Sequence, residues 1–224
     1  LGLGQSASKR LLLINNVDRP TEVARYADQL IHEGVLDDYL FVDDYASAAL
    51  DFFKITKDDL GKGYYYSIAE LVSIFLCETD YLAHFSGDTV GQDGMPSNWF
   101  DTAVELLIER PDVSVVNLAW DLKFSEVDKD AMFLEEIFAY GYGFSDQMYV
   151  IRSMEFKDQI YSYSHPDSDR YPKYGGELFE KRVDSWMRVE NRLRATSRKW
   201  GYRHANFPAW YSLKGILWRL LRQY

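Results

Sequence analysis

Acidic side chains follow two predicted strands of this 224-residue chain closely. Asp43 and Asp44 come after the apolar run 39–42, and Asp88 comes shortly after the aromatic segment 81–85. Ligands of open α/β sheets bind beyond the carboxyl ends of the strands. A carboxylate at such an edge can hold a divalent cation or lie beside a phosphate group. The structural alternative for Asp88 is a loop-capping role after a core strand.

Two acidic positions later in the chain have the chemistry of a catalytic base. Glu177 follows Gly175 and Gly176 at the start of a predicted helix, where the helix dipole and free N–H groups favour an ionised carboxylate. Asp146 lies in a turn before the predicted strand 148–152. A carboxylate beside an acceptor hydroxyl can take its proton during nucleophilic attack. Helix stabilisation by Glu177 and turn capping by Asp146 are the structural alternatives.

Histidine can add a nitrogen ligand to a carboxylate metal site. His204 is the preferred candidate because of its late position, with His84 and His165 as alternatives. Packing or surface exposure is the structural alternative for each of them. The single cysteine, Cys77, lies in an apolar run, which indicates a buried thiol in a reducing compartment.

Predicted strands and helices alternate along the chain. Short apolar runs predict strands, and apolar residues at helical spacing predict helices. The predicted strands cover residues 11–14, 39–42, 81–85, 113–118 and 148–152. The predicted helices cover residues 22–33, 46–53, 64–78, 98–109 and 179–193. This alternation predicts a single α/β domain with a parallel, doubly wound sheet.

The order of these motifs resembles the GT-A fold of nucleotide-sugar glycosyltransferases, especially family 2 and its relatives. The resemblance covers roughly residues 9 to 200 and rests on four segments: Val42-Asp43-Asp44, Lys62-Gly63, Ser86-Gly87-Asp88 and Gly175-Gly176-Glu177. It implies a Rossmann-like, mostly parallel central sheet flanked by helices, in a glycosyltransferase domain at residues 9–208. The departure from the family pattern is Ser86, which stands where the metal motif has its first acid.

The resemblance also implies roles for individual residues. Contacts to the donor nucleotide would come from six of them: Asn15, Asp43, Asp44, Lys62, Ser86 and Gly87. Asp88 and His204 would hold a divalent cation, Mn²⁺ or Mg²⁺, which stabilises the negative charge of the leaving nucleoside diphosphate. Glu177 and Asp146 would be the catalytic residues.

These roles predict an enzyme that transfers a sugar from a UDP-, GDP- or dTDP-sugar to a hydroxyl of a glycan or lipid-linked acceptor. An inverting, direct displacement is expected because a single late acid is present and no second nucleophile is evident. One alternative is a sugar-nucleotide nucleotidyltransferase, although residues 15–20 lack the glycine of its phosphate loop. The other is a non-catalytic glycan-binding or scaffold domain of the same fold, to which Ser86 could point.

Charge is distributed unevenly along the chain, whose net charge is −10. A chain in which acidic residues outnumber basic ones is unsuited to binding nucleic acid, which requires a broad basic surface. Residues 209–224 predict a basic amphipathic helix that lies on an anionic membrane or packs on a neighbouring domain of a longer protein. No apolar run is long enough to span a bilayer. We therefore expect a cytoplasmic protein, peripheral at the inner face of the membrane.

Overall fold

The computed structural model describes residues 7–171 and 177–205. The predicted helix at residues 209–224 lies outside the described residues, as do Gly175 and Gly176. No helix in the described ranges is both long and apolar enough to cross a membrane.

Most predicted elements are present, with small shifts at their ends. The strands are β1 Leu11–Ile14, β2 Asp38–Phe41, β3 Tyr81–Phe85, β4 Thr89–Gly91, β5 Val113–Ala119, β6 Phe133–Leu134, β7 Phe138–Gly141, β8 Met148–Arg152 and β9 Leu193–His204. The α-helices are α1 Pro20–His32, α2 Ala46–Phe53, α3 Lys57–Leu60, α4 Tyr64–Leu76, α5 Trp99–Glu109, α6 Phe124–Asp130, α7 Ser153–Phe156 and α8 Phe179–Val189. Short 3-10 turns connect several of them: η1 Val42–Asp44, η2 Gly61–Gly63, η3 Trp120–Leu122, η4 Ile160–Ser162 and η5 Pro166–Arg170.

The main sheet has seven strands and is mostly antiparallel. Its strand order is β3-β8-β5-β9-β7-β6, with β4 paired to β9, and only the β5–β9 pair is parallel. The β1–β2 pair is parallel but forms a separate two-stranded sheet. The protein is thus α/β, but the expected GT-A, Rossmann-like sheet with mostly parallel strands is wrong.

The reason for this difference lies in the connections. Residues 133–152 fold into β6, β7 and β8 with no helix between them, whereas a parallel neighbour needs a crossover of about a dozen residues or more. The last predicted helix is also too long, because α8 ends at Val189 and Leu193 begins the strand β9. Strand β9 therefore replaces the helix end and pairs with β4, β5 and β7.

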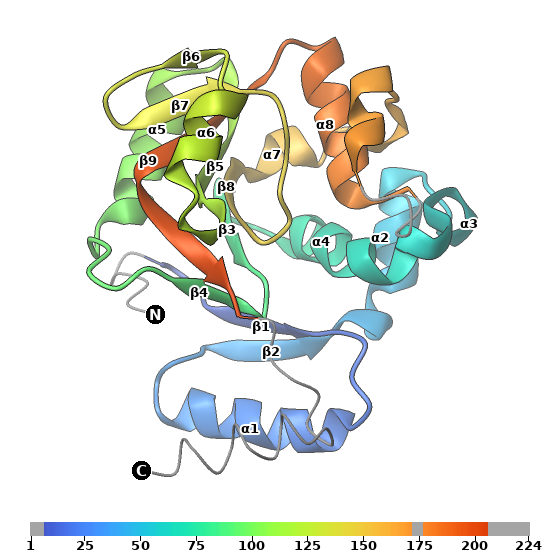
Figure 1. Ribbon diagram of the computed structural model, residues 1–224. Helices are drawn as coiled ribbons and strands as arrows, with labels where there is room; N and C mark the ends of the chain where they lie inside the picture. The colour runs from blue at the N-terminus through green and yellow to red at the C-terminus, as the bar shows by residue number, and fades with distance from the viewer. Residues whose placement is uncertain (1–6, 172–176, 206–224) are drawn as a thin grey trace, which may run out of the picture.

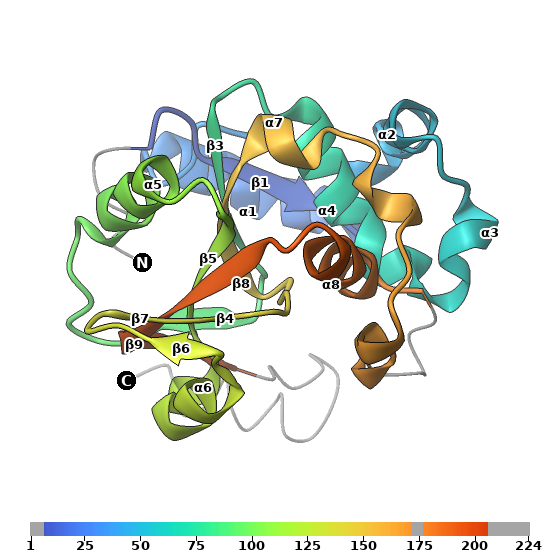
Figure 2. The same cartoon turned by 90° about the horizontal axis from the view of Figure 1, so that it is seen from above.

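Both faces of the main sheet are covered by helices. Figures 1 and 2 show α5 on one side and α4, α7 and α8 on the other. Side chains alternate along β8, as the period of a strand requires. Tyr149 and Ile151 pack with the α4 and α8 residues, and Met148 and Val150 pack with the α5 residues.

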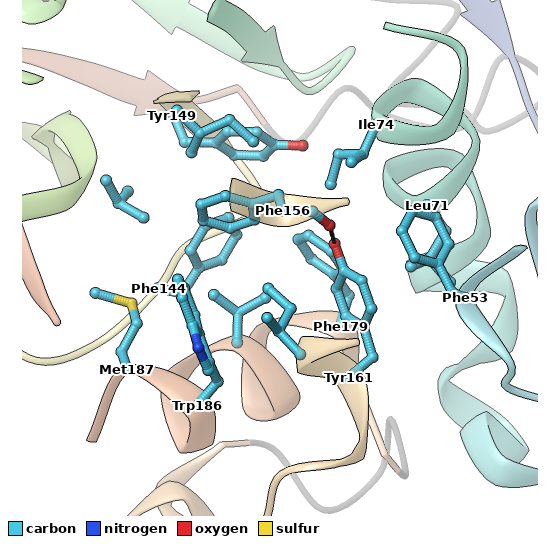
Figure 3. Packing of buried hydrophobic residues seen from close by; sticks show 14 of the residues in the cluster. Phe53, Leu71, Ile74, Phe144, Tyr149, Phe156, Tyr161, Phe179, Trp186 and Met187 are labelled. Atoms are coloured by element: carbon cyan, nitrogen blue, oxygen red, sulfur yellow. Dashed lines mark hydrogen bonds between the residues drawn. The ribbon is translucent and has the colours of Figure 1, made fainter. Parts of the chain in front are cut away.

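The cluster on the α4 and α8 side is rich in aromatic rings (Figure 3). Phe144 and Phe179 pack edge to face with their ring centroids 5.3 Å apart. The Tyr161 hydroxyl donates a hydrogen bond of 2.7 Å to the Phe156 carbonyl, so this buried polar group is satisfied. A third cluster joins β1 and β2 to α2 and α4. These contacts fix α4 and α8 against the sheet.

Gly201 allows β9 to approach β5 closely. A Cβ atom at this position would lie 2.7 Å from the Ala119 carbonyl oxygen and 2.8 Å from a Leu122 methyl group. We expect Gly201→Ala to lower the free energy of unfolding by about 1–3 kcal/mol, the usual cost of overpacking. Urea denaturation measures the change. Gly87→Ala is the matched control, because its Cβ would meet open space, and equal stability of the two variants would contradict the prediction.

Candidate functional site

Antiparallel pairing places the end of β3 beside the start of β8. Phe85 pairs with Met148, and the next residue, Ser86, donates its backbone N–H to the Gln147 carbonyl at 2.9 Å. The Ser86 hydroxyl also lies 2.8 Å from Gln147 Oε1 and 2.7 Å from Asp88 Oδ1. Ser86 therefore links the turn after β3 to the segment before β8.

Strand β9 brings His204 to the same turn. Thr89 of β4 pairs with His204, and the His204 Nε2 lies 2.6 Å from Asp88 Oδ2. The two side chains are both a little over one-third exposed. Burial alone would raise the pKa of Asp88, but the hydrogen bonds from Ser86 and His204 hold that pKa below its ordinary value. Asp88 is thus an anion at neutral pH.

The donor set of Asp88 and His204 suits a divalent cation. Carboxylate oxygen and imidazole nitrogen are ligands of Mn²⁺ and similar ions, and a cation held by few protein ligands takes the others from phosphate and water. Across residues 7–171 and 177–205, no three His, Cys, Asp or Glu side chains converge to hold an ion by themselves. The alternative ligand His165 lies elsewhere, where its Nδ1 accepts the Asp167 N–H. Asp88 and His204 could supply two ligands of an ion, and the others would have to come from a bound ligand or water.

A second acidic pair lies close to Asp88. The Asp146 backbone N–H donates to Glu180 Oε1 at 2.9 Å, and the Gln147 amide donates to Asp146 Oδ1 at 3.3 Å. Burial raises the pKa of Asp146, and the nearby charge of Asp88 adds to this rise. Burial and the neighbouring Asp146 raise the pKa of Glu180 to about 8. Close carboxylates resist joint ionisation, so the pair retains a proton near neutral pH.

A buried polar cluster lies near this pair. Glu70 of α4 accepts a hydrogen bond of 2.9 Å from the Tyr149 hydroxyl, and the His84 Nδ1 lies 3.3 Å from the same Glu70 oxygen. Burial holds the pKa of Glu70 well above its ordinary value, and the charges of Asp146 and Glu180 act in the same direction. Burial lowers the pKa of His84 to about 4. His84 is thus a neutral core histidine stacked on Tyr149.

The structure places Glu177 on the surface. Its carboxylate is about half exposed and pairs with Lys181 at 2.8 Å. Glu180, three residues further along the chain, is the carboxylate that accepts the Asp146 N–H. The sequence signal for an inward-facing Glu180 was its helical spacing, because Glu180 precedes the buried residues Val183 and Met187 by three and seven positions.

Ser86 and Gly87 lie in the turn of Asp88, whereas the other four predicted donor-binding residues form a separate group. Asn15 follows β1 and donates to the Tyr65 carbonyl at 3.3 Å. Asp43 follows β2 and lies near Tyr64 at the start of α4, where its charge adds to the rise that burial causes in the pKa of Tyr64. Asp44 and Lys62 are exposed in the neighbouring turns η1 and η2. One turn further along α4, Ser67 accepts the Phe179 N–H at 2.8 Å, so α4 runs from this group to the residue beside Glu180.

An open cleft of about 610 Å³ begins at Glu180. Its lining includes the side chains of Trp120, Lys129, Asp130, Arg170, Tyr171, Glu180 and Arg194. Tyr171 is fixed by two backbone contacts, because its hydroxyl accepts from the Phe144 N–H and donates to the Phe144 carbonyl, both at 2.8 Å. The cleft therefore has aromatic walls, cationic groups and one carboxyl group with a raised pKa.

Comparison with known proteins assigns the chain to no family. No protein-family model matches the chain, and no curated protein matches its sequence. The evidence for a function is therefore the geometry of the two acidic pairs and of the cleft.

The raised pKa of Glu180 predicts a specific pH dependence of stability. The folded protein retains the Glu180 proton up to about pH 8, whereas the unfolded chain loses it near 4.5. Stability from this group is therefore present below pH 4.5 and lost as the pH rises toward 8.

We expect the wild-type free energy of unfolding to fall by at least about 1 kcal/mol more than that of Glu180→Gln between pH 5 and pH 8.5, since one pKa unit corresponds to about 1.4 kcal/mol. Urea denaturation at both pH values measures this difference. Glu177→Gln is the control and should follow the wild type. Identical pH slopes for wild type and Glu180→Gln would contradict the assignment.

Proposed function

We propose that the protein is a glycosyltransferase that moves a sugar from a nucleotide-diphosphate donor to a hydroxyl group of a glycan or lipid-linked acceptor. The observation that carries this proposal is the proximity of two acidic pairs with opposite properties. Asp88, beside His204, is ionised and a little over one-third exposed, whereas the pair of Asp146 and Glu180 is partly buried and retains a proton. Hydrogen bonds connect the two pairs: the Ser86 hydroxyl donates to Asp88, the Ser86 N–H donates to the Gln147 carbonyl, and the Gln147 amide donates to Asp146. Charge stabilisation and proton transfer are the two needs of this reaction.

Glu180 is the base in this proposal, because it lines the cleft that an acceptor can enter. The acceptor oxygen attacks the anomeric carbon of the donor sugar, the bond to the diphosphate oxygen breaks, and the Glu180 carboxylate takes the hydroxyl proton. A base works best when its pKa lies near the operating pH, and the pKa of Glu180 is about 8. The single attack from one side of the sugar inverts the anomeric configuration.

Asp88 and His204 face the leaving group in this proposal. A divalent cation bound there together with the donor would neutralise charge on the diphosphate. Ser86 holds the Asp88 carboxylate in place through a hydrogen bond of 2.7 Å. The nucleoside would extend toward Asn15 and Asp43, which lie near Tyr64 and Tyr65 at the start of α4.

Glu180 and Glu177 offer a matched comparison three residues apart on the chain. We expect Glu180→Gln to lower turnover at least about a hundredfold, the usual effect of losing a general base, with donor affinity retained. Glu177→Gln should stay within a few-fold of wild type, because Glu177 pairs with Lys181 on the surface. Initial rates of transfer from labelled UDP-, GDP- and dTDP-sugars measure both. Wild-type turnover should also rise from pH 6 to about 8, and near wild-type rates in Glu180→Gln would refute the role.

The role of Asp88 is tested by removing its charge. Asp88→Asn should abolish both turnover and cation-dependent donor binding while leaving the melting temperature nearly unchanged, because the side chain is more than one-third exposed. Asp93→Asn, in the exposed loop that follows β4, is the control. The same donor panel with Mn²⁺ and with EDTA measures the effect. Full activity in EDTA would contradict the cation, and donor binding without turnover would favour a non-catalytic glycan-binding domain.

A further inference from the structure

Two guanidinium groups converge in the cleft that Glu180 lines. The terminal nitrogens of Arg170 and Arg194 lie so near Gly143 that a Cβ atom there would collide with both. Gly143 also has a φ of +124°, a conformation that favours glycine. Both arginines reach one carboxylate, that of Asp130, at 3.5 and 2.7 Å. One carboxylate thus faces two cations.

Other acidic groups do not remove this imbalance. Arg170 lies 3.7 Å from Asp184, but Asp184 already pairs with Arg188 at 2.9 Å. The cleft also contains Lys129 and Glu126, one charge of each sign. Glu180 retains its proton near neutral pH because its pKa is about 8. While Glu180 is protonated, the side chains that line the cleft therefore carry one more positive than negative charge.

Arg194 is buried and incompletely paired. Its side chain is only 8% exposed, and its Nε atom makes no hydrogen bond within the described residues. Its guanidinium lies 5.3 Å from the centre of the Trp120 ring, within the range of a cation–π contact. A buried guanidinium with an unused donor beside a cleft is well suited to an oxyanion that arrives with a ligand.

We infer that this cleft binds an anionic sugar, stacked against Trp120, whose carboxylate or phosphate group lies on Arg170 and Arg194. The inference rests on the proposed function in one respect, namely that the anionic sugar is the acceptor. A hydroxyl group of a sugar bound in this cleft would lie near Glu180, which lines it. Carboxylates and phosphates share the planar or tetrahedral oxygen pairs that guanidinium groups recognise. Aromatic rings supply the apolar surface for the face of a sugar ring.

Ligand-observed NMR without nucleotide tests the inference. The probes are methyl glucuronide, glucose 6-phosphate and the neutral methyl glucoside. We expect at least one anionic probe to bind at least about tenfold more tightly than the neutral one, the gain of a charge-assisted hydrogen bond. The two anionic probes separate a carboxylate from a phosphate as the preferred group. Equal binding of all three sugars would overturn the inference.

Substitutions locate the binding. Arg170→Gln should remove the preference for the anionic probe, and Arg170→Lys should restore part of it. Trp120→Ala should weaken the binding of neutral and anionic sugars alike. Lys199→Gln is the control, because Lys199 is exposed and pairs with Glu136 outside the cleft. Circular dichroism checks that each variant is folded.

The outcomes separate this inference from the proposed function. Donor turnover without any preference for anionic sugars overturns the inference alone. Tight binding of an anionic sugar with no turnover of any donor overturns the proposed function and leaves the binding site in place. If Arg170→Gln weakens binding of UDP or GDP but leaves the anionic sugar unaffected, the arginines hold the donor diphosphate and the inference is wrong.

Discussion

The antiparallel position of β8 in the main sheet is the constraint on which the candidate site depends. Because β8 runs against β3, the residues that precede β8 lie beside those that follow β3. The Ser86 N–H therefore donates to the carbonyl of Gln147, which lies 61 positions away in the sequence. The antiparallel β4–β9 pair acts in the same way and brings His204 to Asp88. Two acidic motifs thus meet at one edge of the sheet.

Electrostatics then gives the two acidic pairs different properties. Asp88 is partly exposed and has hydrogen-bond donors, so its pKa falls. Asp146 and Glu180 lie deeper, and Glu70 lies buried near them, so burial and mutual repulsion raise their pKa values. The aromatic core in Figure 3 supplies the low-polarity surroundings, because Phe144 and Phe179 stand next in sequence to the acidic segments. Acidic groups whose pKa values are shifted in opposite directions are typical of sites that combine an anionic group with a proton carrier.

The sequence allowed most local elements to be predicted, since periodic apolar residues decide them. It also singled out Asp88, His204 and Asp146, which the structure brings close together. The direction of the strands could not be obtained in this way, because pairing depends on contacts between distant segments such as β3 and β8. The glycines before Glu177 favoured that residue as the base, whereas the packing of α8 decides that Glu180 contacts Asp146.

A crystal structure with Mn²⁺ and a nucleoside diphosphate tests the central claim most directly, because manganese is located by its anomalous scattering. We expect one manganese peak in contact with the Asp88 carboxylate, the His204 imidazole and the diphosphate, with Glu180 on the side of the cleft. A nucleotide bound elsewhere, or bound with no ion at Asp88 and His204, would contradict it.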